Sequence, residues 1–276
     1  MSSSQNTAIM RRSSITFFYS SLFFPRAIRD DVRTLYAFVR TADDFVDRIP
    51  QDAKGFQKFC EEYRACADGS ECISEVVQEF VELARRRRIQ RDWVDSFLWA
   101  MGQDLSKAVY TDISETLAYV YGSAETVGMM MARIMELPEE SLPCARALGR
   151  AFQYINFIRD IFEDAAMGRT YLPLGELRAA GLAEVSEECV RKNPDAFNRF
   201  IRGQLKRYND WLKEAENGYR YIPARALAAV KTAADMFNYT ASVIQRRPIS
   251  VLERKVKPPR ILVIATGVRN FLRLTI

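Results

Sequence analysis

The sequence predicts an all-α fold, and three observations support this prediction. Within long intervals, apolar residues recur three and four positions apart, as they do on one face of an α-helix. Prolines, which end helices or open them at the first turn, fall between these intervals. Strand signals are scarce, because no alternating apolar run leads into an Asn-Gly or Asp-Gly turn.

The same pattern gives the expected elements in order. We expect helices near residues 26–48, 52–66, 72–89, 91–107, 113–136, 140–166, 194–217, 222–246 and 249–275. Residues 168–193 hold three glycines and one proline, so the longest irregular connection is expected there. Residues 1–12 are expected to be flexible. Because the chain has no repeat, linker or break in composition, residues 1–276 are expected to form one multi-helix domain.

The composition excludes several kinds of catalytic site. The 276 residues include 40 Lys and Arg, 35 Asp and Glu, and no histidine. A Ser-His-Asp triad, a histidine zinc site and an iron site that needs histidine ligands are therefore impossible. The net charge of +5 is mildly basic. The run of four consecutive arginines from Arg85 to Arg88 is expected to complement a helix C-terminus and stay solvated. We therefore expect no nucleic-acid partner.

The cysteines and the start of the chain indicate a compartment. Five cysteines form no C-x-x-C pair and are widely spaced, at Cys60, Cys66, Cys72, Cys144 and Cys189. We expect free thiols in a reducing compartment. The first residues lack the apolar core of a secretory signal, and no apolar stretch reaches the roughly 18 residues of a membrane span. These features predict a cytoplasmic protein.

A first acidic helix face lies in residues 36–47. At about 100° per residue, four polar side chains lie within about 60° of one another: Tyr36, Arg40, Asp43 and Asp47. Like charges spaced four residues apart destabilise a helix slightly. A divalent cation would offset that cost, although a solvated surface face is the plainer alternative.

A second acidic face lies in residues 153–164. Offsets of three, four and four place four side chains on one stripe: Gln153, Asn156, Asp160 and Asp164. Apolar residues cover the rest of this helix, which indicates that it is buried. Buried carboxylates must be paired or bind a metal. The oxygen donors of the two faces suit Mg²⁺ or Mn²⁺, which is usually completed by water and substrate phosphates.

At these residues the sequence resembles the squalene/phytoene synthase family of head-to-head prenyl transferases. The first face is similar to that family's Tyr-x-x-x-Arg-x-x-Asp-x-x-x-Asp motif. The second is similar to its Gln-x-x-Asn-x-x-x-Asp-x-x-x-Asp motif. Further similarities are Gly168, Arg169, Tyr171, Leu172 and Pro173 after the second face, Ser14, Thr16 and Phe17 before the first, residues 119–128 in mid-chain, and the late Tyr239 and Arg254.

The resemblance implies an all-α isoprenoid-synthase fold with a central cavity in which two allylic prenyl diphosphates condense. It implies metal ligands at Asp43, Asp47, Asn156, Asp160 and Asp164. It also implies that the diphosphates or the reacting carbons are contacted by Ser14, Thr16, Phe17, Tyr36, Arg40, Gln153, Arg169, Tyr171, Tyr239 and Arg254. The expected cofactor is Mg²⁺, with NADPH needed only for a squalene product. The wording of the motifs favours phytoene from geranylgeranyl diphosphate, and a squalene, dehydrosqualene or presqualene product from farnesyl diphosphate stays open.

Two positions depart from the family pattern. Glu125 stands where a glycine is expected, and Phe162 stands where a small residue is common. A carboxylate at 125 should be paired with an arginine or turned towards solvent, unless it faces the cavity and affects the prenyl chains.

Other functions remain as alternatives. Asp43, Asp44 and Asp47 also fit the first aspartate-rich motif of a class I terpene cyclase, and a non-catalytic helical relative is the third possibility. The apolar C-terminal segment 261–276 predicts a packed last helix, with a peripheral membrane contact that receives a hydrocarbon product as the alternative. The oligomeric state stays open.

Overall fold

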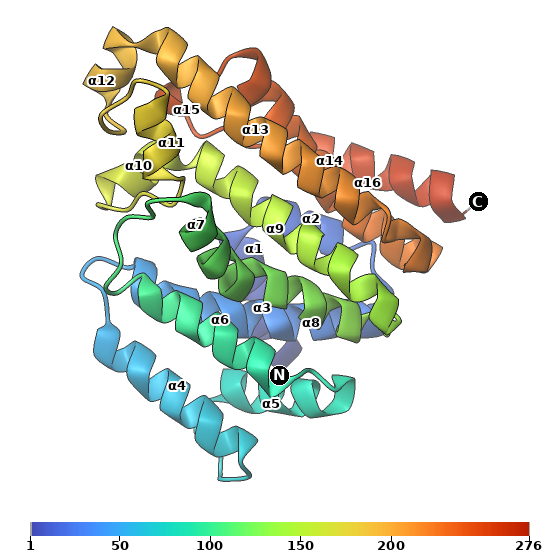
Figure 1. Cartoon of the computed structure of the whole chain (residues 1–276). Helices are drawn as coiled ribbons and strands as arrows, with labels where there is room; N and C mark the ends of the chain where they lie inside the picture. The colour runs from blue at the N-terminus through green and yellow to red at the C-terminus, as the bar shows by residue number, and fades with distance from the viewer. Residues whose placement is uncertain (1, 276) are drawn as a thin grey trace.

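The computed structural model describes residues 2–275, and in that range the chain forms helices and no strand (Figure 1). The α-helices are α1 Ser2–Ser13, α2 Ile15–Ser21, α3 Arg26–Asp47, α4 Ala53–Ala67, α5 Glu75–Arg87, α6 Arg91–Gln103, α7 Ile113–Val120, α8 Thr126–Ile134, α9 Leu142–Arg159, α10 Ile161–Ala166, α11 Leu174–Ala179, α12 Glu187–Lys192, α13 Pro194–Glu216, α14 Ala224–Arg246, α15 Ser250–Glu253 and α16 Arg260–Thr275. A π-helical turn η1 spans Tyr121–Glu125, and 3₁₀ turns η2 and η3 span Glu139–Ser141 and Tyr219–Tyr221. The all-α prediction is confirmed.

Several expected boundaries differ from the observed ones. The helix expected at 140–166 bends at Asp160, which ends α9 and precedes α10. The helix expected at 249–275 is two helices: α15 ends at Glu253, where Arg254 is extended, and Pro258 and Pro259 directly precede α16. The connection 168–193 contains α11 and α12. Met1 lies outside the described residues, and residues 2–12, expected to be flexible, belong to α1, in which Asn6 and Met10 are buried.

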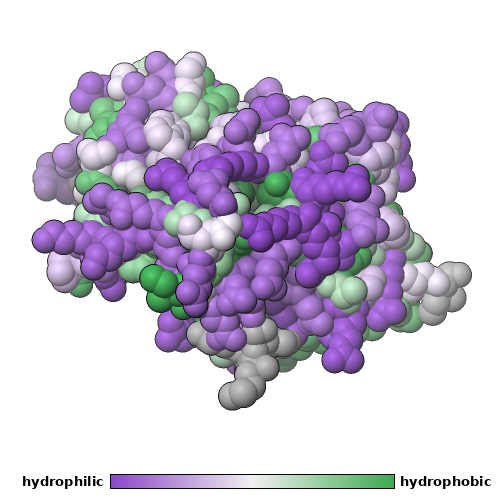
Figure 2. All heavy atoms as spheres, turned by 90° about the horizontal axis from the view of Figure 1, so that it is seen from below, coloured by the Kyte–Doolittle hydropathy of each residue, from purple (hydrophilic) through white to green (hydrophobic). Residues whose placement is uncertain are grey.

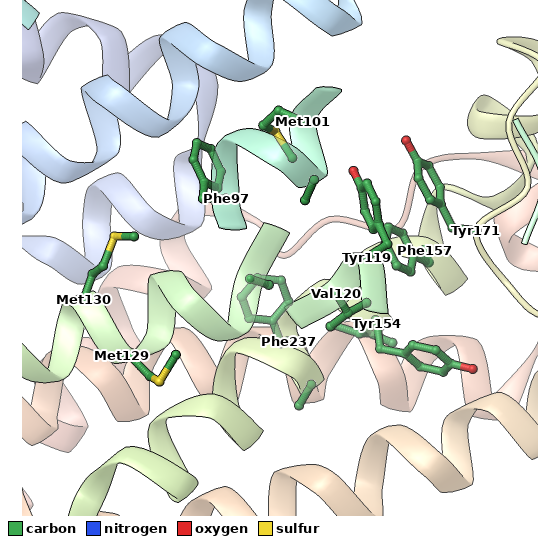
Figure 3. Packing of buried hydrophobic residues seen from close by; sticks show 14 of the residues in the cluster. Phe97, Met101, Tyr119, Val120, Met129, Met130, Tyr154, Phe157, Tyr171 and Phe237 are labelled. Atoms are coloured by element: carbon green, nitrogen blue, oxygen red, sulfur yellow. The ribbon is translucent and has the colours of Figure 1, made fainter. Parts of the chain in front are cut away.

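Helix α9 lies at the centre of the arrangement. It packs against α8, η1, α13 and α14, while α3 packs against α1, α4, α5, α6 and α8 (Figure 1). The apolar core runs through these contacts. Figure 3 shows one part of it, where the rings of Tyr119, Phe157 and Tyr171 gather, with centroids 4.5 Å apart for Phe157 and Tyr171. These aromatic contacts join α7, α9 and the segment after α10.

Two glycines allow α9 to approach η1 and α8 closely. A Cβ on Gly149 would collide with the carbonyl oxygen of Ala124, and one on Gly128 would collide with the carbonyl oxygen of Ala145. Backbone carbonyls of packed helices cannot move aside as a side-chain tip can. Both positions therefore require glycine.

The cysteines differ in part from expectation. The structure joins Cys66 and Cys72 in a disulfide, so the expectation of five free thiols is wrong for this pair; Cys60, Cys144 and Cys189 are free. The turn after α4 brings the Cα atoms of the pair to 5.2 Å, an approach that the search for C-x-x-C spacing does not detect.

The arginine run at 85–88 is also less solvated than expected. Arg87 is mostly buried and, with Arg86, binds the buried carboxylate of Asp31 at 2.7 and 2.5 Å. This ion-paired group joins α5 to α3. Arg86 and Arg87 are therefore counter-ions of Asp31, while Arg85, Arg86 and Arg88 stay exposed at the C-terminal end of α5, as expected for most of the run.

The surface agrees with the modest charge of the chain. Figure 2 shows one face covered mainly by hydrophilic residues, with apolar residues in small separate areas. Among the described helices, none combines the length and the apolar character that crossing a bilayer requires.

The close helix contact gives a stability prediction. Gly149→Ala should lower the free energy of unfolding by about 1–3 kcal/mol, because the added methyl group forces η1 and α9 apart. Urea denaturation followed by circular dichroism measures this change.

Gly203→Ala is the matched control. Gly203 is exposed in α13, and a Cβ there has no neighbour within 4 Å. Alanine should stabilise the helix at this position by about 0.5–1 kcal/mol. Equal effects of the two substitutions would show that the helix contact does not require glycine.

Candidate active site

An apolar cavity of about 290 Å³ extends along α9. One face of α9 lines it, through Cys144, Ala145, Leu148, Gly149, Phe152, Gln153 and Asn156. Walls also come from α2, α3, α8, η3 and α14, and no charged side chain lines it. The polar groups Tyr36, Gln153 and Asn156 lie towards the acidic residues, so the cavity has one polar end and an apolar interior.

The first acidic face lies on the last turns of α3. Arg40 donates to Asp43 at 2.7 Å and pairs with Asp44 at 2.5 Å. Burial, followed by the charge of Asp47, raises the pKa of Asp43 to about 7, although Arg40 opposes this shift. Burial likewise raises the pKa of Tyr36 to about 12. Asp43 thus lies in a site where burial and a neighbouring carboxylate disfavour its ionised form.

The second acidic face continues from α9 into α10 across the bend at Asp160. The backbone bonds from Asp160 to Asn156 and from Asp164 to Asp160 are both 2.8 Å, so the expected stripe survives the bend. Arg159 binds Asp160 through two bonds of 2.7 and 2.5 Å, and Lys255 pairs with Asp160 at 3.1 Å. Burial, followed by the charge of Asp160, raises the pKa of Asp164 to about 8.

Arg169 joins the two acidic faces. Gly168, at φ +78°, lets the chain turn after α10, and the N–H of Arg169 then bonds to the carbonyl of Asp164 at 2.8 Å. The guanidinium donates to Asp47 at 2.8 Å and to the carbonyl of Val46 at 2.6 Å. The charge of Asp47 also contributes to the raised pKa of Asp164. The faces therefore lie near one another.

A buried carboxylate that the sequence did not single out supports this junction. Asp104, at the end of α6, accepts hydrogen bonds of 2.7 Å from the hydroxyls of both Tyr119 and Tyr171. Its backbone carbonyl accepts from Gln51 at 2.8 Å. The phenol of Tyr171 is thereby fixed beside Arg169, 3.4 Å from the guanidinium.

Two basic groups of the site were also missed. Arg159 lies within the second motif but outside its four-residue spacing, and Lys255 follows the arginine that the resemblance selected. Their position directly beside residues of the predicted site was the sequence signal that could have identified them. No sequence pattern marks Asp104, because its partners lie 15 and 67 positions away.

The remaining expected residues divide into two groups. Phe17 lines the cavity with its ring 5.8 Å from that of Phe237, while Ser14 caps α2 by accepting from the N–H of Phe17 at 3.2 Å and Thr16 lies in the same helix. Tyr239 and Arg254 are exposed. Within residues 2–275 neither side chain forms a hydrogen bond or ion pair, so the structure does not join them to the two acidic faces.

The protein supplies only part of the ligand shell that Mg²⁺ needs. Within residues 2–275, no three acidic, cysteine or histidine side chains are close enough together to hold an ion. Mg²⁺ normally takes one or two carboxylates and completes its shell with water and substrate phosphates. The pairs Asp43 with Asp47 and Asp160 with Asp164 fit that requirement, and Asn156 adds an amide oxygen.

Both departures from the family pattern lie away from the cavity lining. Glu125 is 2% exposed and forms ion pairs with Arg146 at 2.9 Å and Arg150 at 2.6 Å, as expected for a paired buried carboxylate. Phe162 packs against Phe197 at a centroid distance of 5.8 Å. Neither residue lines the cavity.

The comparisons with known proteins agree with this architecture. The profile of the squalene/phytoene synthase family matches residues 10–261. The 15-cis-phytoene synthase of Pantoea ananas is 30% identical over 240 residues, which cover 83% of this chain and 77% of that protein. The corresponding enzyme of Synechococcus elongatus is 26% identical over 91% of this chain and 86% of its own.

Solved structures show the same fold. A dehydrosqualene synthase in complex with ligand has a TM-score of 0.87 at 19% identity, over 99% of this chain and 96% of that one. Squalene synthase HpnC from Alicyclobacillus acidocaldarius has a TM-score of 0.79 at 24% identity, over 89% and 93%. The fold is thus the all-α isoprenoid-synthase fold. The chain belongs to the squalene/phytoene synthase family and is a prenyl transferase of that type.

Proposed function

We propose that this chain condenses two molecules of geranylgeranyl diphosphate head to head into phytoene. The observation that carries the proposal is the cavity, whose polar end lies at the two acidic faces and whose apolar part follows α9. The names of the relatives point to the same product, since the similar proteins of Pantoea ananas and Synechococcus elongatus are 15-cis-phytoene synthases.

The length of the cavity supports the longer substrate. Lining residues extend from Asn156 to Cys144, which is about 18 Å along a helix that rises about 1.5 Å per residue. Each bond of an extended chain advances it by roughly 1.25 Å, a little less than the C–C bond length of about 1.5 Å. An extended C20 prenyl chain therefore measures about 19 Å, and a C15 chain about 14 Å. A C20 chain fills this length, whereas a C15 chain leaves its far end empty.

Basic side chains at the polar end would bind the diphosphates. Arg40, Arg159 and Arg169 have guanidinium groups, which match phosphate oxygens in pairs. Lys255 adds a fourth positive charge beside the second face. Mg²⁺ held by Asp43, Asp47, Asn156, Asp160 and Asp164 would supply the Lewis acidity that neutralises the departing diphosphate.

Aromatic rings would protect the allylic cation. Phe17 and Phe152 line the cavity, and the ring of Phe237 packs against both, 4.4 Å from that of Phe152. Ring faces stabilise a cation through their quadrupole, and an apolar wall excludes the water that would quench it. Tyr36 lies next to this cluster, 6.3 Å from Phe17 between ring centroids.

The proposal is tested by incubating the purified chain with geranylgeranyl or farnesyl diphosphate and Mg²⁺, with and without NADPH, and analysing the hydrocarbon extract. Phytoene from the C20 substrate without NADPH is the expected result. Dehydrosqualene or squalene from the C15 substrate alone would replace the proposal by the farnesyl alternative. A cyclic product would indicate a terpene cyclase, and no product from either substrate would indicate a non-catalytic relative.

Removal of one carboxylate from either acidic face should abolish turnover. Asp43→Asn and Asp160→Asn each take a charged oxygen ligand from a predicted ion site, so kcat should fall by roughly a hundredfold or more. Product formation from radiolabelled substrate measures this loss. Asp210→Asn, on an exposed ion pair of α13, is the matched control and should keep full activity.

A chain-length prediction uses two positions on the lined face of α9. Ala145 lies about 17 Å from Asn156 and Leu148 about 12 Å from it along the helix. Ala145→Leu should block the end of a C20 chain but spare a C15 chain, lowering the C20/C15 ratio of kcat/KM about tenfold through steric overlap. Leu148→Phe should obstruct both chains.

Competition between the two diphosphates measures the ratio for each variant. Equal loss of both substrates in Ala145→Leu would mean that the prenyl chain does not extend along α9. Thermal unfolding of the variants separates such an effect from a general loss of structure.

A further inference from the structure

The last helix, α16, carries an exposed apolar stripe. Four large aliphatic side chains remain exposed to 83%, 43%, 46% and 49%: Ile261, Ile264, Val268 and Leu272. At about 100° per residue they fall within about 80° of one another. A continuous exposed aliphatic face of this kind is typical of an interaction surface, whereas single exposed apolar residues are common.

Residues beside the stripe and on the opposite face of α16 pack against the rest of the molecule. Asn270 donates to Asp235 of α14 at 2.8 Å, and the ring of Phe271 lies 6.4 Å from that of Phe23. A Cβ on Gly267 would collide with the same Phe23 ring. Tight packing on one side fixes which face points outward. The stripe is therefore a stable feature of the surface.

Charge indicates what this stripe would contact. Helix α16 contains Arg260, Arg269 and Arg273 and no acidic residue. Its neighbour α14 adds three basic residues and one acidic residue, so the two helices carry a surplus of five positive charges, equal to the net charge of the whole chain. Among the described residues, Arg260 and Arg273 have no ion-pair partner.

We propose that α16 docks on the surface of a bilayer that contains anionic lipid. Aliphatic side chains would enter the acyl boundary while the flanking arginines bind lipid phosphates, the arrangement of an interfacial amphipathic helix. The helix has 16 residues and would lie in the membrane plane rather than cross it.

A second copy of the chain fits this surface less well. In a two-fold dimer the same patch meets itself, so arginines would face arginines with no acidic residue on the helix to pair with them. Anionic lipid provides the missing negative charge. Charge complementarity thus selects the bilayer over self-association.

Docking at α16 would place the cavity close to the membrane. Helix α2 packs against α16, and its residues Phe17, Ser20 and Ser21 line the cavity from the other side. Helices α16 and α2 would then separate the bilayer from an apolar product. The docking inference does not depend on the proposed substrate, because it is measured without substrate.

Vesicle co-sedimentation of the purified full chain tests the proposal. The wild type should bind vesicles of phosphatidylcholine with phosphatidylglycerol, bind weakly to phosphatidylcholine alone, and dissociate as salt screens the arginines. Ile264→Asp with Leu272→Asp should weaken the partition at least about tenfold, because two aliphatic side chains leave the acyl boundary and two negative charges are added. Arg260→Gln with Arg273→Gln should weaken binding to the anionic vesicles alone.

Ile73→Asp is the matched control, since Ile73 is 92% exposed in the connection between α4 and α5. It should bind as the wild type does, and circular dichroism should show equal helicity for every variant. The proposal is overturned if the wild type binds no vesicle, or if the α16 variants and Ile73→Asp bind equally. It is also overturned if sedimentation velocity shows a dimer that the α16 variants dissociate.

Discussion

Repulsion among carboxylates is the constraint on which this site depends. Helices α3, α9 and α10 bring Asp43, Asp47, Asp160 and Asp164 near one another, where burial and neighbouring carboxylates raise the pKa of Asp43 and of Asp164. The fold holds such a cluster only because positive side chains are placed among the acids. Arg169 is central to this arrangement, since it binds Asp47 and the carbonyl of Val46 while its own backbone bonds to Asp164.

The same cations account for the way the proposed site would receive a diphosphate. Arg40, Arg159 and Lys255 each bind a carboxylate of an acidic face in the absence of substrate. Divalent ions on those carboxylates would release the basic side chains to bind phosphate oxygens. The carboxylates would then pair with the ions and the basic side chains with the diphosphate, so the positive and negative charges of the site would stay nearly balanced. Asp104 stays outside this exchange, because both of its oxygens are occupied by the hydroxyls of Tyr119 and Tyr171.

Local periodicity predicted the parts of the structure that depend on neighbours in sequence. The helical class and the two acidic stripes follow from spacings of three and four residues. Contacts between distant segments were not predictable in this way: Asp104 reaches Tyr171 across 67 positions, and Cys66 meets Cys72 only because the chain turns after α4. The sequence did not indicate the bend at Asp160, because the residue spacing of the stripe continues through it. The backbone hydrogen bonds from Asp160 to Asn156 and from Asp164 to Asp160 are kept there, while the φ and ψ angles of Asp160 leave the helical region.

The polarity of the side chains decreases from the acidic faces, through the cavity, to the outer face of α16. The uncharged polar groups Tyr36, Gln153 and Asn156 lie at the end of the cavity nearest the acidic faces, and mostly apolar side chains line the rest. Helix α2 lies between that lining and α16, whose outer face is aliphatic. A prenyl diphosphate has the same sequence of properties, with a charged head and a long apolar chain, whereas its condensed hydrocarbon has lost the head. In the proposed reaction, the basic side chains and divalent ions at the acidic faces would bind the diphosphate of the substrate and nothing on the product, while the apolar lining would bind both. A hydrocarbon held only by that lining needs an apolar destination to leave, and a bilayer on the outer face of α16 would provide one.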